Sequence, residues 1–295
     1  MSFVESPESR RGRGLALMLA ACGGFGLAPS FARLAYMDGS DPTTAVLLRF
    51  TIAAMTVTLL LRRRGRPLAL PPRERMHAIG IGVLSATMAW GYLAAVAHVA
   101  VSVAALVFLT YPAMTAIAAH LAGVERLTRL RVAALAAAFG GIALVVGFDA
   151  GARHEPIGIV LALLAAVACA GAILATARVL RRADALAVNG HAMLTGMAIF
   201  LVVAALAGGP AWPAGTLGWV ALVAASVAYT GGIVAVFVAI GLLGPFRAAA
   251  LGNVEPIFAV GGAMILLGER IGTLQLAGMM LVVGALVMLQ LRDPD

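Results

Sequence analysis

The sequence predicts an all-α membrane protein, in which ten transmembrane helices form two inverted five-helix repeats around a central cavity. Three observations predict this fold class. Hydrophobic residues make up 62% of the chain and charged residues 12%, so a water-soluble fold would expose far too much apolar surface. The apolar residues fall into ten segments of a length that crosses a bilayer. The second half of the chain also repeats the first.

The repeat is visible as a constant offset of 144 residues, which brings Pro112 onto Pro256. The same offset aligns four further pairs: Glu125 with Glu269, Arg126 with Arg270, Leu130 with Leu274 and Gly140 with Gly284. At the centre of the repeat the copies differ, because Glu255 corresponds to Tyr111. The chain is therefore predicted to consist of two related halves that have diverged at their centre.

The first apolar segment follows a short, basic N-terminus and is long enough to span a ~30 Å hydrocarbon core, so it is predicted to be a transmembrane helix and not a secretory signal. The third and fourth spans come from one apolar run cut at 98–100, and the sequence GLLGPF marks a turn between the eighth and ninth. The spans group into predicted repeats 14–148 and 156–291. In order, the ten spans are Gly14–Tyr36, Thr43–Leu61, Met76–Ala97, Val101–Ala122, Leu130–Phe148, Pro156–Val179, Ala187–Ala207, Thr216–Leu242, Phe246–Leu267 and Thr273–Leu291.

The distribution of arginine predicts the orientation in the membrane. With the N-terminus inside, only Arg153 and Arg270 fall in outer loops, a bias that places both termini in the cytoplasm. Because each half has an odd number of spans, the second half enters the membrane in the opposite sense. The net charge of +8 sits in short clusters between apolar segments, as in cytoplasmic loops, so no nucleic-acid partner is expected. The cytoplasmic arginines are Arg10, Arg11, Arg13, Arg62, Arg63, Arg64, Arg66, Arg73, Arg75, Arg126, Arg129, Arg131, Arg178, Arg181, Arg182, Arg247 and Arg292.

Inverted repeats are typical of secondary transporters, because one scaffold can then open to either side around a site near the bilayer midplane. Two stretches carry a more specific resemblance: LTYPAMTAIAAHLAGVERLTRLRVAALAAAFGGIALV in the first half and LGNVEPIFAVGGAMILLGERIGTLQLAGMMLVVGALVM in the second. Together they resemble the paired EamA domains of the drug/metabolite transporter superfamily, over about residues 14–291. The resemblance implies a five-plus-five inverted arrangement and export of amino acids, including aromatic amino acids, other metabolites or toxic compounds.

Two prolines predict helix kinks at the centre of each half. Pro256 lacks a backbone donor and frees the carbonyl of Gly252, and Pro112 does the same for Phe108. Such carbonyls must face protein or a wet cavity, because they are costly in lipid. Glu255 beside Pro256 is then either a carboxylate or proton site on a cavity wall, or a residue of a packed helix interface that only pairs with an arginine or caps a freed donor.

Five further residues are candidates to bind a substrate. Arg49, about two turns into the second span, would neutralise a substrate carboxylate or Glu255, and we expect it to have a buried partner. Tyr92 and Tyr111 would supply aromatic walls and hydroxyl donors, Tyr111 with the better claim from its position opposite Glu255 in the repeat. Tyr229 and Asn253 are comparable candidates. For each tyrosine, a core residue bonded to a neighbouring helix is the alternative.

Two other polar residues are interpreted as interfacial. Arg33, near the outer end of the first span, is expected to snorkel to the outer interface rather than to contact a substrate. His98 is expected at the same interface, with a proton-relay role as the alternative.

The sequence contains no catalytic, metal-binding or nucleotide-binding motif, so no enzyme activity, metal or cofactor is expected. The expected function is a bacterial inner-membrane exporter that moves a small metabolite, foremost an amino acid, by alternating access. A multidrug or other metabolite exporter of the same architecture is the first alternative. An intramembrane enzyme, a lipid-handling protein and a non-transporting structural protein are the others. The expected partners are the substrate and the lipid bilayer, and a monomer is compatible with the sequence.

Overall fold

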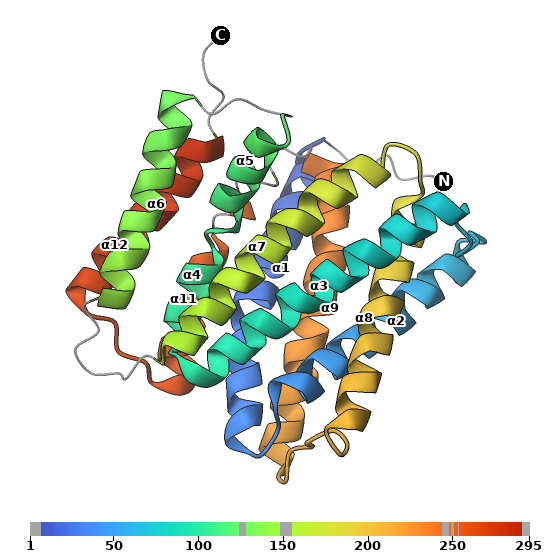
Figure 1. The fold of residues 1–295 in the computed structure, drawn as a ribbon, viewed down its shortest axis with the longest axis horizontal. Coiled ribbons are helices and arrows are strands. Elements are labelled where there is room, and N and C mark those ends of the chain that lie inside the picture. The colour runs from blue at the N-terminus through green and yellow to red at the C-terminus, as the bar shows by residue number, and fades with distance from the viewer. Residues whose placement is uncertain are drawn as a thin grey trace.

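The computed structural model describes residues 7–123, 128–147, 155–243, 248, 251–252 and 254–290. Every regular element within these ranges is an α-helix (Figure 1). The helices are α1 (Pro7–Met37), α2 (Pro42–Arg63), α3 (Pro72–His98), α4 (Val101–Phe108), α5 (Tyr111–Leu121), α6 (Arg129–Gly147), α7 (Pro156–Val179), α8 (Ala185–Leu206), α9 (Thr216–Leu243), α11 (Glu255–Leu267) and α12 (Thr273–Gln290).

The predicted all-helical membrane fold is confirmed. Seven helical stretches in the described chain are long and apolar enough to cross a membrane, and they occupy seven of the ten predicted spans. Three shorter apolar helices, Val132–Val145, Glu255–Leu267 and Thr273–Ala285, occupy the other three. The fourth span is broken into α4 and α5.

Several helices begin at a proline, which moves the starts of α2 and α3 ahead of the predicted ones, whereas α7 begins as predicted. Pro42, Pro72 and Pro156 open α2, α3 and α7. A proline fits the first turn because its backbone torsion is already helical and its missing N–H has no partner there. At α2 the side chain of Asp41 also caps the helix by accepting a hydrogen bond from the Thr44 N–H at 2.7 Å.

The packing follows the predicted pseudo-two-fold symmetry. Helix α1 packs most extensively against α9, and their counterparts at the 144-residue offset, α7 and α3, form the next most extensive pair. The remaining counterparts pack against each other, α2 with α8 and α6 with α12. Figure 1 shows α3 and α7 side by side across the molecule and α6 against α12 at one end. A central space is thus enclosed by helices from both halves.

Helices α6 and α12 cross at two glycines. A Cβ atom added to Gly278 would lie 2.5 Å from the carbonyl oxygen of Gly141, and one added to Gly141 would lie 2.7 Å from that of Gly278. Helix pairs in membranes approach closely where such small residues meet, because packing and not the hydrophobic effect drives their association. This crossing joins the last helices of the two halves.

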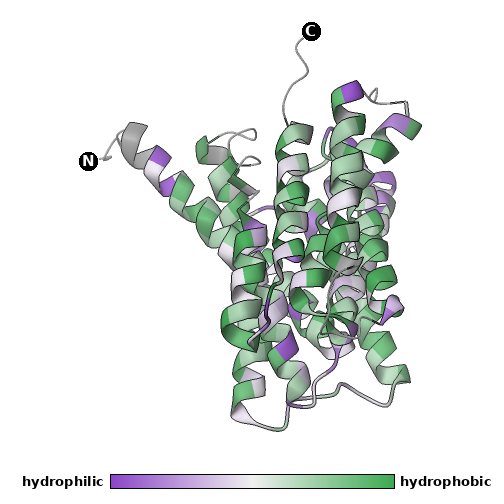
Figure 2. Cartoon of the chain, turned by 90° about the vertical axis from the view of Figure 1, so that its left-hand side faces the viewer, coloured by the Kyte–Doolittle hydropathy of each residue, from purple (hydrophilic) through white to green (hydrophobic). Residues whose placement is uncertain are grey.

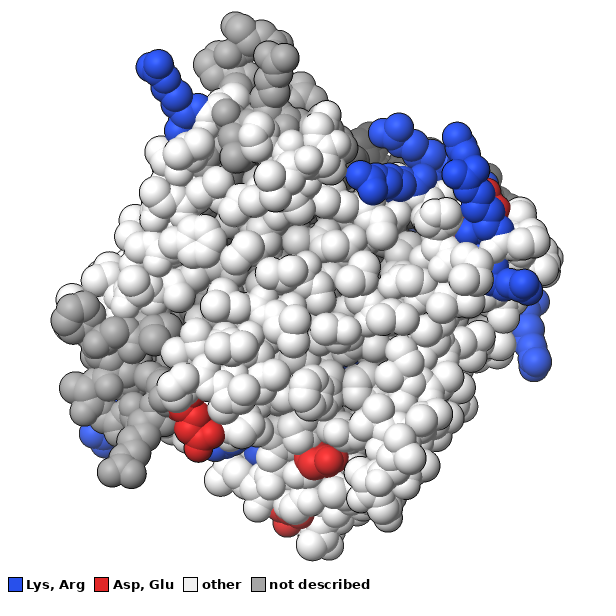
Figure 3. Space-filling view, in the orientation of Figure 1, with Lys and Arg blue, Asp and Glu red and all other residues white. Residues whose placement is uncertain are grey.

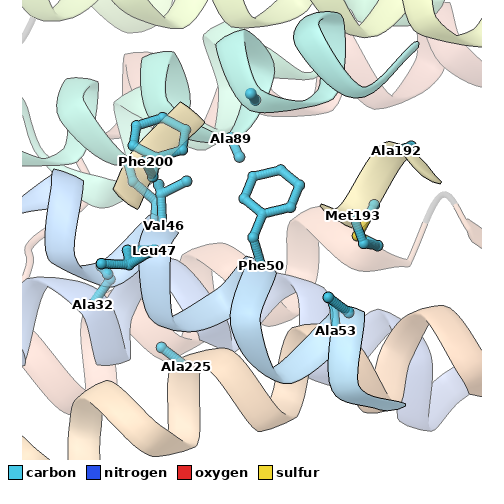
Figure 4. Close-up of a cluster of buried hydrophobic side chains, with 14 of the residues drawn as sticks. Ala32, Val46, Leu47, Phe50, Ala53, Ala89, Ala192, Met193, Phe200 and Ala225 are labelled. Carbon is cyan, nitrogen blue, oxygen red and sulfur yellow. The ribbon is translucent and has the colours of Figure 1, made fainter. Parts of the chain in front are cut away.

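A cluster of buried hydrophobic side chains fastens α2 to α8 (Figure 4). The rings of Phe50 and Phe200 stack with centroids 6.2 Å apart. Gly196 makes room for Phe50, because a Cβ atom there would lie 2.4 Å from the ring. With Phe50 held against α8, the preceding residue Arg49 points to a different side of α2, where it lines the central cavity described below.

The outer surface has the character of a membrane protein. Apolar residues run along the lengths of the helices in Figure 2, and polar ones concentrate near their ends. Large hydrophobic side chains are exposed in the described chain, among them Ile265 at 84% and Val202 at 59%. In Figure 3 most of the visible arginines lie along the upper and right edges, most of the visible acidic groups lie near the lower edge, and the surface between them is uncharged. The apolar belt between these rims is the surface that a bilayer would cover.

Candidate functional site

Both central prolines lie at a break in the helical chain. Helix α4 ends at Phe108 and α5 begins at Tyr111, with Pro112 as its second residue. Helix α11 begins at Glu255, again with proline second. Tyr111 and Glu255, which correspond to each other in the repeat, are therefore each the first residue of a helix. A carboxylate in a first helical turn is favoured by the helix dipole.

The backbone near the second break is satisfied by a cysteine thiol. Cys22 Sγ on α1 lies 3.5 Å from the carbonyl oxygen of Leu251 and 4.0 Å from that of Gly252, the carbonyl that Pro256 was predicted to free. The Val254 N–H also donates to Leu251 at 3.1 Å. The predicted kink residues Gly252, Pro256 and Pro112 all lie at breaks that face protein.

The breaks border a central cavity of about 250 Å³. Five of the six residues predicted to contact a substrate line it: Arg49, Tyr92, Tyr111, Tyr229 and Glu255. The sixth, Asn253, lies outside the described residues. The lining residues not singled out in the sequence are Phe25, Ala28, Pro29, Met88, Ala89, Phe108, Cys169 and Ile173.

One of these omissions had a signal in the sequence. Pro29 lies inside α1, and Phe25, Ala28 and Pro29 follow the spacing of one helical face. A proline within an apolar span marks a backbone carbonyl that must be satisfied internally, which is the argument that located the other two prolines. The aromatic and apolar omissions had no such signal, because lipid-facing and cavity-facing side chains are alike in composition.

Arg49 is the cation of the cavity. Arg49 is 4% exposed, and its guanidinium carbon lies 4.1 Å from the centre of the Tyr229 ring. Tyr229 is held in turn by an edge contact with Phe25 at 5.4 Å. The buried Nε atom of Arg49 has no hydrogen-bond partner, and no hydrogen bond or ion pair within the described chain engages this guanidinium. The buried partner expected for Arg49 is thus a π face, which leaves the N–H fork unused.

A row of aromatic rings forms another wall of the cavity. Tyr92 and Phe108 stack with centroids 4.6 Å apart, and Phe108 contacts Tyr111 at 5.4 Å. The three residues come from α3, α4 and α5. This wall offers a broad apolar face with two phenol groups.

Glu255 lines the same cavity and forms no ion pair with any described residue within 4.0 Å. The alternative in which Glu255 serves only as counter-ion to an arginine is therefore not the arrangement found in the described chain. The cavity is thus lined by an acidic residue, Glu255, and a cationic residue, Arg49, that form no ion pair with each other.

Arg33 and His98 lie outside the cavity lining. Arg33 Nη1 donates to the carbonyl oxygens of Val96 at 3.0 Å and Ala97 at 2.9 Å, so this half-buried side chain caps the last turn of α3 rather than simply snorkelling. His98 Nδ1 lies 2.6 Å from Glu155 Oε2 at the exposed start of α7.

Glu269 has a structural role that the sequence did not reveal. Its carboxylate accepts hydrogen bonds from the Val101 N–H at 2.6 Å and from the Ser102 N–H and hydroxyl at 3.1 and 2.6 Å. These groups form the first turn of α4, which otherwise has no side-chain cap. The contact ties the segment after α11 to α4, across the two halves.

A second cavity, of about 220 Å³, lies between α2, α8 and α9. It extends toward the end of the molecule that carries Arg64, Arg66, Arg73, Arg178, Arg181 and Arg182, called the arginine-rich end below. Its lining runs from Ala53 and Thr230 to Arg66 and Asp184. Ala53 is one helical turn beyond Arg49, and Thr230 follows Tyr229. The Arg49–Tyr229 contact therefore lies where the two cavities approach each other.

A comparison with protein-family models finds two matches to the family described as "EamA-like transporter family", over residues 12–147 and 156–291. The chain belongs to the EamA-like transporter family. A solved crystal structure is similar to this EamA-like protein over 96% of both chains, with 22% identity and a TM-score of 0.62, which shows a shared fold. No curated protein matches the sequence.

Membership in the EamA-like family makes the chain a multi-pass membrane transporter protein. The central cavity is lined by helices of both matched segments. Within the described residues, no cluster of three or more His, Cys, Asp or Glu side chains is placed to hold a metal ion.

Proposed function

We propose that this protein is an inner-membrane secondary transporter that exports a small metabolite, foremost an amino acid, by alternating access. The observation that carries the proposal is the pair of opposite charges, Arg49 and Glu255, which line one cavity and have no ion-pair partner in the described chain. An unpaired charge inside a membrane protein is costly, and a ligand that pairs with both groups would offset that cost.

A zwitterion fits this charge arrangement. The planar N–H fork of Arg49 suits the two oxygens of a carboxylate, and the carboxylate of Glu255 suits an ammonium group. An α-amino acid carries both groups on one carbon and has no net charge. It would neutralise both side chains without adding charge to the cavity.

The size of the cavity and its aromatic wall narrow the class of substrate. A volume of about 250 Å³ lies below the roughly 300–1,000 Å³ of pockets that hold drug-sized ligands, which favours a small metabolite over the multidrug alternative. The stacked row of Tyr92, Phe108 and Tyr111 offers a face on which an apolar or aromatic side chain would pack. Aromatic amino acids are therefore the first substrates to test.

Alternating access is supported by the different closure of the two ends. Toward one end, Glu269 ties the halves together at the start of α4. Toward the arginine-rich end, the second cavity approaches the Arg49–Tyr229 contact. The proposal places the arginine-rich end and both termini in the cytoplasm of a bacterial cell, with the repeats at 14–148 and 156–291. In that orientation the Glu269 contact lies on the outer side, so the structure corresponds to a state closed toward the outside.

Counterflow in proteoliposomes tests the proposal. Liposomes loaded with one unlabelled amino acid at a time would be given the same labelled compound outside. We expect accumulation above protein-free liposomes for at least one amino acid, a loss of at least tenfold in Glu255→Gln and Arg49→Lys, and an unchanged rate in the control Arg62→Gln, whose side chain is exposed. Counterflow of apolar cations but of no amino acid would replace the proposal by the multidrug alternative.

A further inference from the structure

A third cavity, of about 400 Å³, lies between the start of α3 and the end of α7, away from the central one. Four of its lining residues are arginines, and only one is acidic. The lining consists of Arg73, Glu74, His77, Ala175, Arg178, Val179, Arg181 and Arg182. This basic pocket is thus built by α3 from the first half and by the end of α7, with the turn after it, from the second half.

Glu74 lines the basic pocket, but none of the four arginines there forms an ion pair within 4.0 Å in the described chain. The ion pairs of the described chain are Arg66–Asp184 and His98–Glu155, and neither involves an arginine of the pocket. The nearby carboxylate of Asp184 also accepts hydrogen bonds from the N–H groups of Leu186 and Ala187, both at 3.0 Å. The Asp184 carboxylate therefore already caps the start of α8. Four guanidinium groups and one carboxylate thus line the hollow, which leaves it with an excess of positive charge.

The surroundings of the basic pocket indicate where the anion comes from. On α3, the side chains of Met76, Ile79 and Val83 are 65%, 36% and 46% exposed, and Leu180 at the end of α7 is 39% exposed. In Figure 3, arginines cluster at the upper right edge, above an uncharged surface. A basic site directly bordering an exposed apolar surface matches a lipid, whose phosphate and acyl chains are joined in one molecule.

We propose that the basic pocket binds the phosphodiester headgroup of an anionic phospholipid from the leaflet at the arginine-rich end of the protein. The guanidinium groups of Arg178 at the end of α7, of Arg181 and Arg182 in the turn that follows, and of Arg73 on α3 surround the phosphate. Guanidinium is suited to this because its planar N–H groups match phosphate oxygens in pairs. The lipid tails lie against the exposed apolar face of α3.

Such a lipid would connect the two halves at the end opposite to the Glu269 contact. Helices α3 and α7 also carry Tyr92 and Cys169 of the central cavity, so the separation of their ends is coupled to the shape of that cavity. Transport is then expected to depend on anionic lipid in the surrounding bilayer.

The test measures unfolding temperature and binding in detergent, with dioctanoyl phosphatidylglycerol, dioctanoyl phosphatidylcholine and inorganic phosphate as probes. We expect phosphatidylglycerol to stabilise the wild-type protein saturably and the other two probes to have little effect. Each arginine near an anionic surface contributes about a fivefold factor in binding. The variant R178Q/R181Q/R182Q should therefore bind phosphatidylglycerol about a hundredfold more weakly.

Two control variants keep the test decisive. R11Q/R62Q/R63Q removes the same charge from exposed positions outside the pocket and should bind like the wild type. R178K/R181K/R182K keeps the charge but lacks the paired N–H groups, so it should bind more weakly than the wild type and more tightly than the glutamine variant. An unfolding temperature near that of the wild type in the absence of lipid shows that loss of binding in the glutamine variant is not a folding defect. The proposal is overturned if phosphatidylcholine stabilises equally, if phosphate alone saturates the effect, or if both glutamine variants weaken binding to the same extent.

Discussion

The guanidinium carbon of Arg49 lies 4.1 Å from the centre of the Tyr229 ring, and this ring is the one specific partner that the described chain gives to a buried cation. A cation–π contact contributes about 0.5–2 kcal/mol, whereas burying an unpaired charge costs several. The residue is therefore kept at a cost in stability, which is what a group reserved for a ligand requires.

We expect Arg49→Met to stabilise the protein by about 1–3 kcal/mol while abolishing transport. The matched control is Arg33→Met, which removes two hydrogen bonds to the end of α3 and should destabilise by about 2 kcal/mol. Thermal unfolding in detergent measures both variants. A fall in stability for Arg49→Met similar to that of Arg33→Met would show that Arg49 is structural.

Proton coupling through Glu255 is a second prediction, because this carboxylate lies in the cavity without an ion-pair partner in the described chain. A wild-type transporter coupled in this way responds to an imposed pH gradient, and Glu255→Gln, which cannot exchange a proton, does not. Uptake into proteoliposomes at a series of pH gradients measures this. Tyr111→Phe, at the corresponding position of the other half, should keep the response. Retention of the wild-type pH dependence in Glu255→Gln would exclude Glu255 as the coupling group.

Weakening the Glu269 contact should favour opening toward the end where it lies. Glu269→Gln removes the charge that three donors of α4 share, a loss of about 1–2 kcal/mol. In a Cys22→Ser background, Cys169 in the central cavity is the remaining thiol and reports access.

We expect Glu269→Gln to speed labelling of Cys169 by a membrane-impermeant maleimide added from the Glu269 side. Glu155→Gln, which breaks the exposed contact with His98, is the control and should leave the rate unchanged. Equal labelling rates in Glu269→Gln and the parent protein would rule out the contact as a closure.

The crossing of α6 and α12 predicts a strong dependence on position for glycine substitution. Gly278→Ala places a methyl group 2.5 Å from a backbone oxygen of Gly141 and should destabilise by about 1–3 kcal/mol. Gly284→Ala on the same helix meets no atom within 4 Å and should be neutral or slightly stabilising. Unfolding temperatures of the two variants compare the sites directly, and similar values would contradict the close crossing.

Asp184 predicts a pH-dependent contribution to stability. Its hydrogen bond from the Ala187 N–H, with further contributions from Arg66 and Leu186, lowers the pKa of this carboxyl below its ordinary value of 3.8. The stabilisation is therefore present above pH 3.8 and is lost as the pH falls through the lower folded-state pKa. Asp184→Asn should cost up to about 1 kcal/mol at pH 7, because the pair with Arg66 is solvent-screened. That difference should shrink below about pH 4, as measured by unfolding at both pH values, and a constant difference would contradict it.

The sequence was informative wherever a residue type was out of place for its surroundings. An acid, an arginine and prolines within apolar spans are costly in lipid, and those residues now line one cavity or its helix breaks. Phe25 and Phe108 could not be recognised, because an aromatic side chain suits lipid and cavity equally.

Contacts between distant segments were also beyond the sequence. Glu269 was recognisable only as a marker of the repeat, since its partners Val101 and Ser102 lie 168 and 167 residues away in the chain. The arginines of α3 and α7 predicted orientation, but their meeting around one pocket depends on how the two halves pack.

The difference between Tyr111 and Glu255 has a consequence for how such a protein can arise. A five-helix subunit that paired with an upside-down copy of itself would present the same side chain twice, either two acids repelling each other or two phenols with no charge. Joining both halves in one polypeptide after gene duplication removes that constraint, because each half can then mutate alone. The single acid in the described lining of the cavity therefore requires two halves that are not identical, and a version split into two identical subunits could not reproduce it.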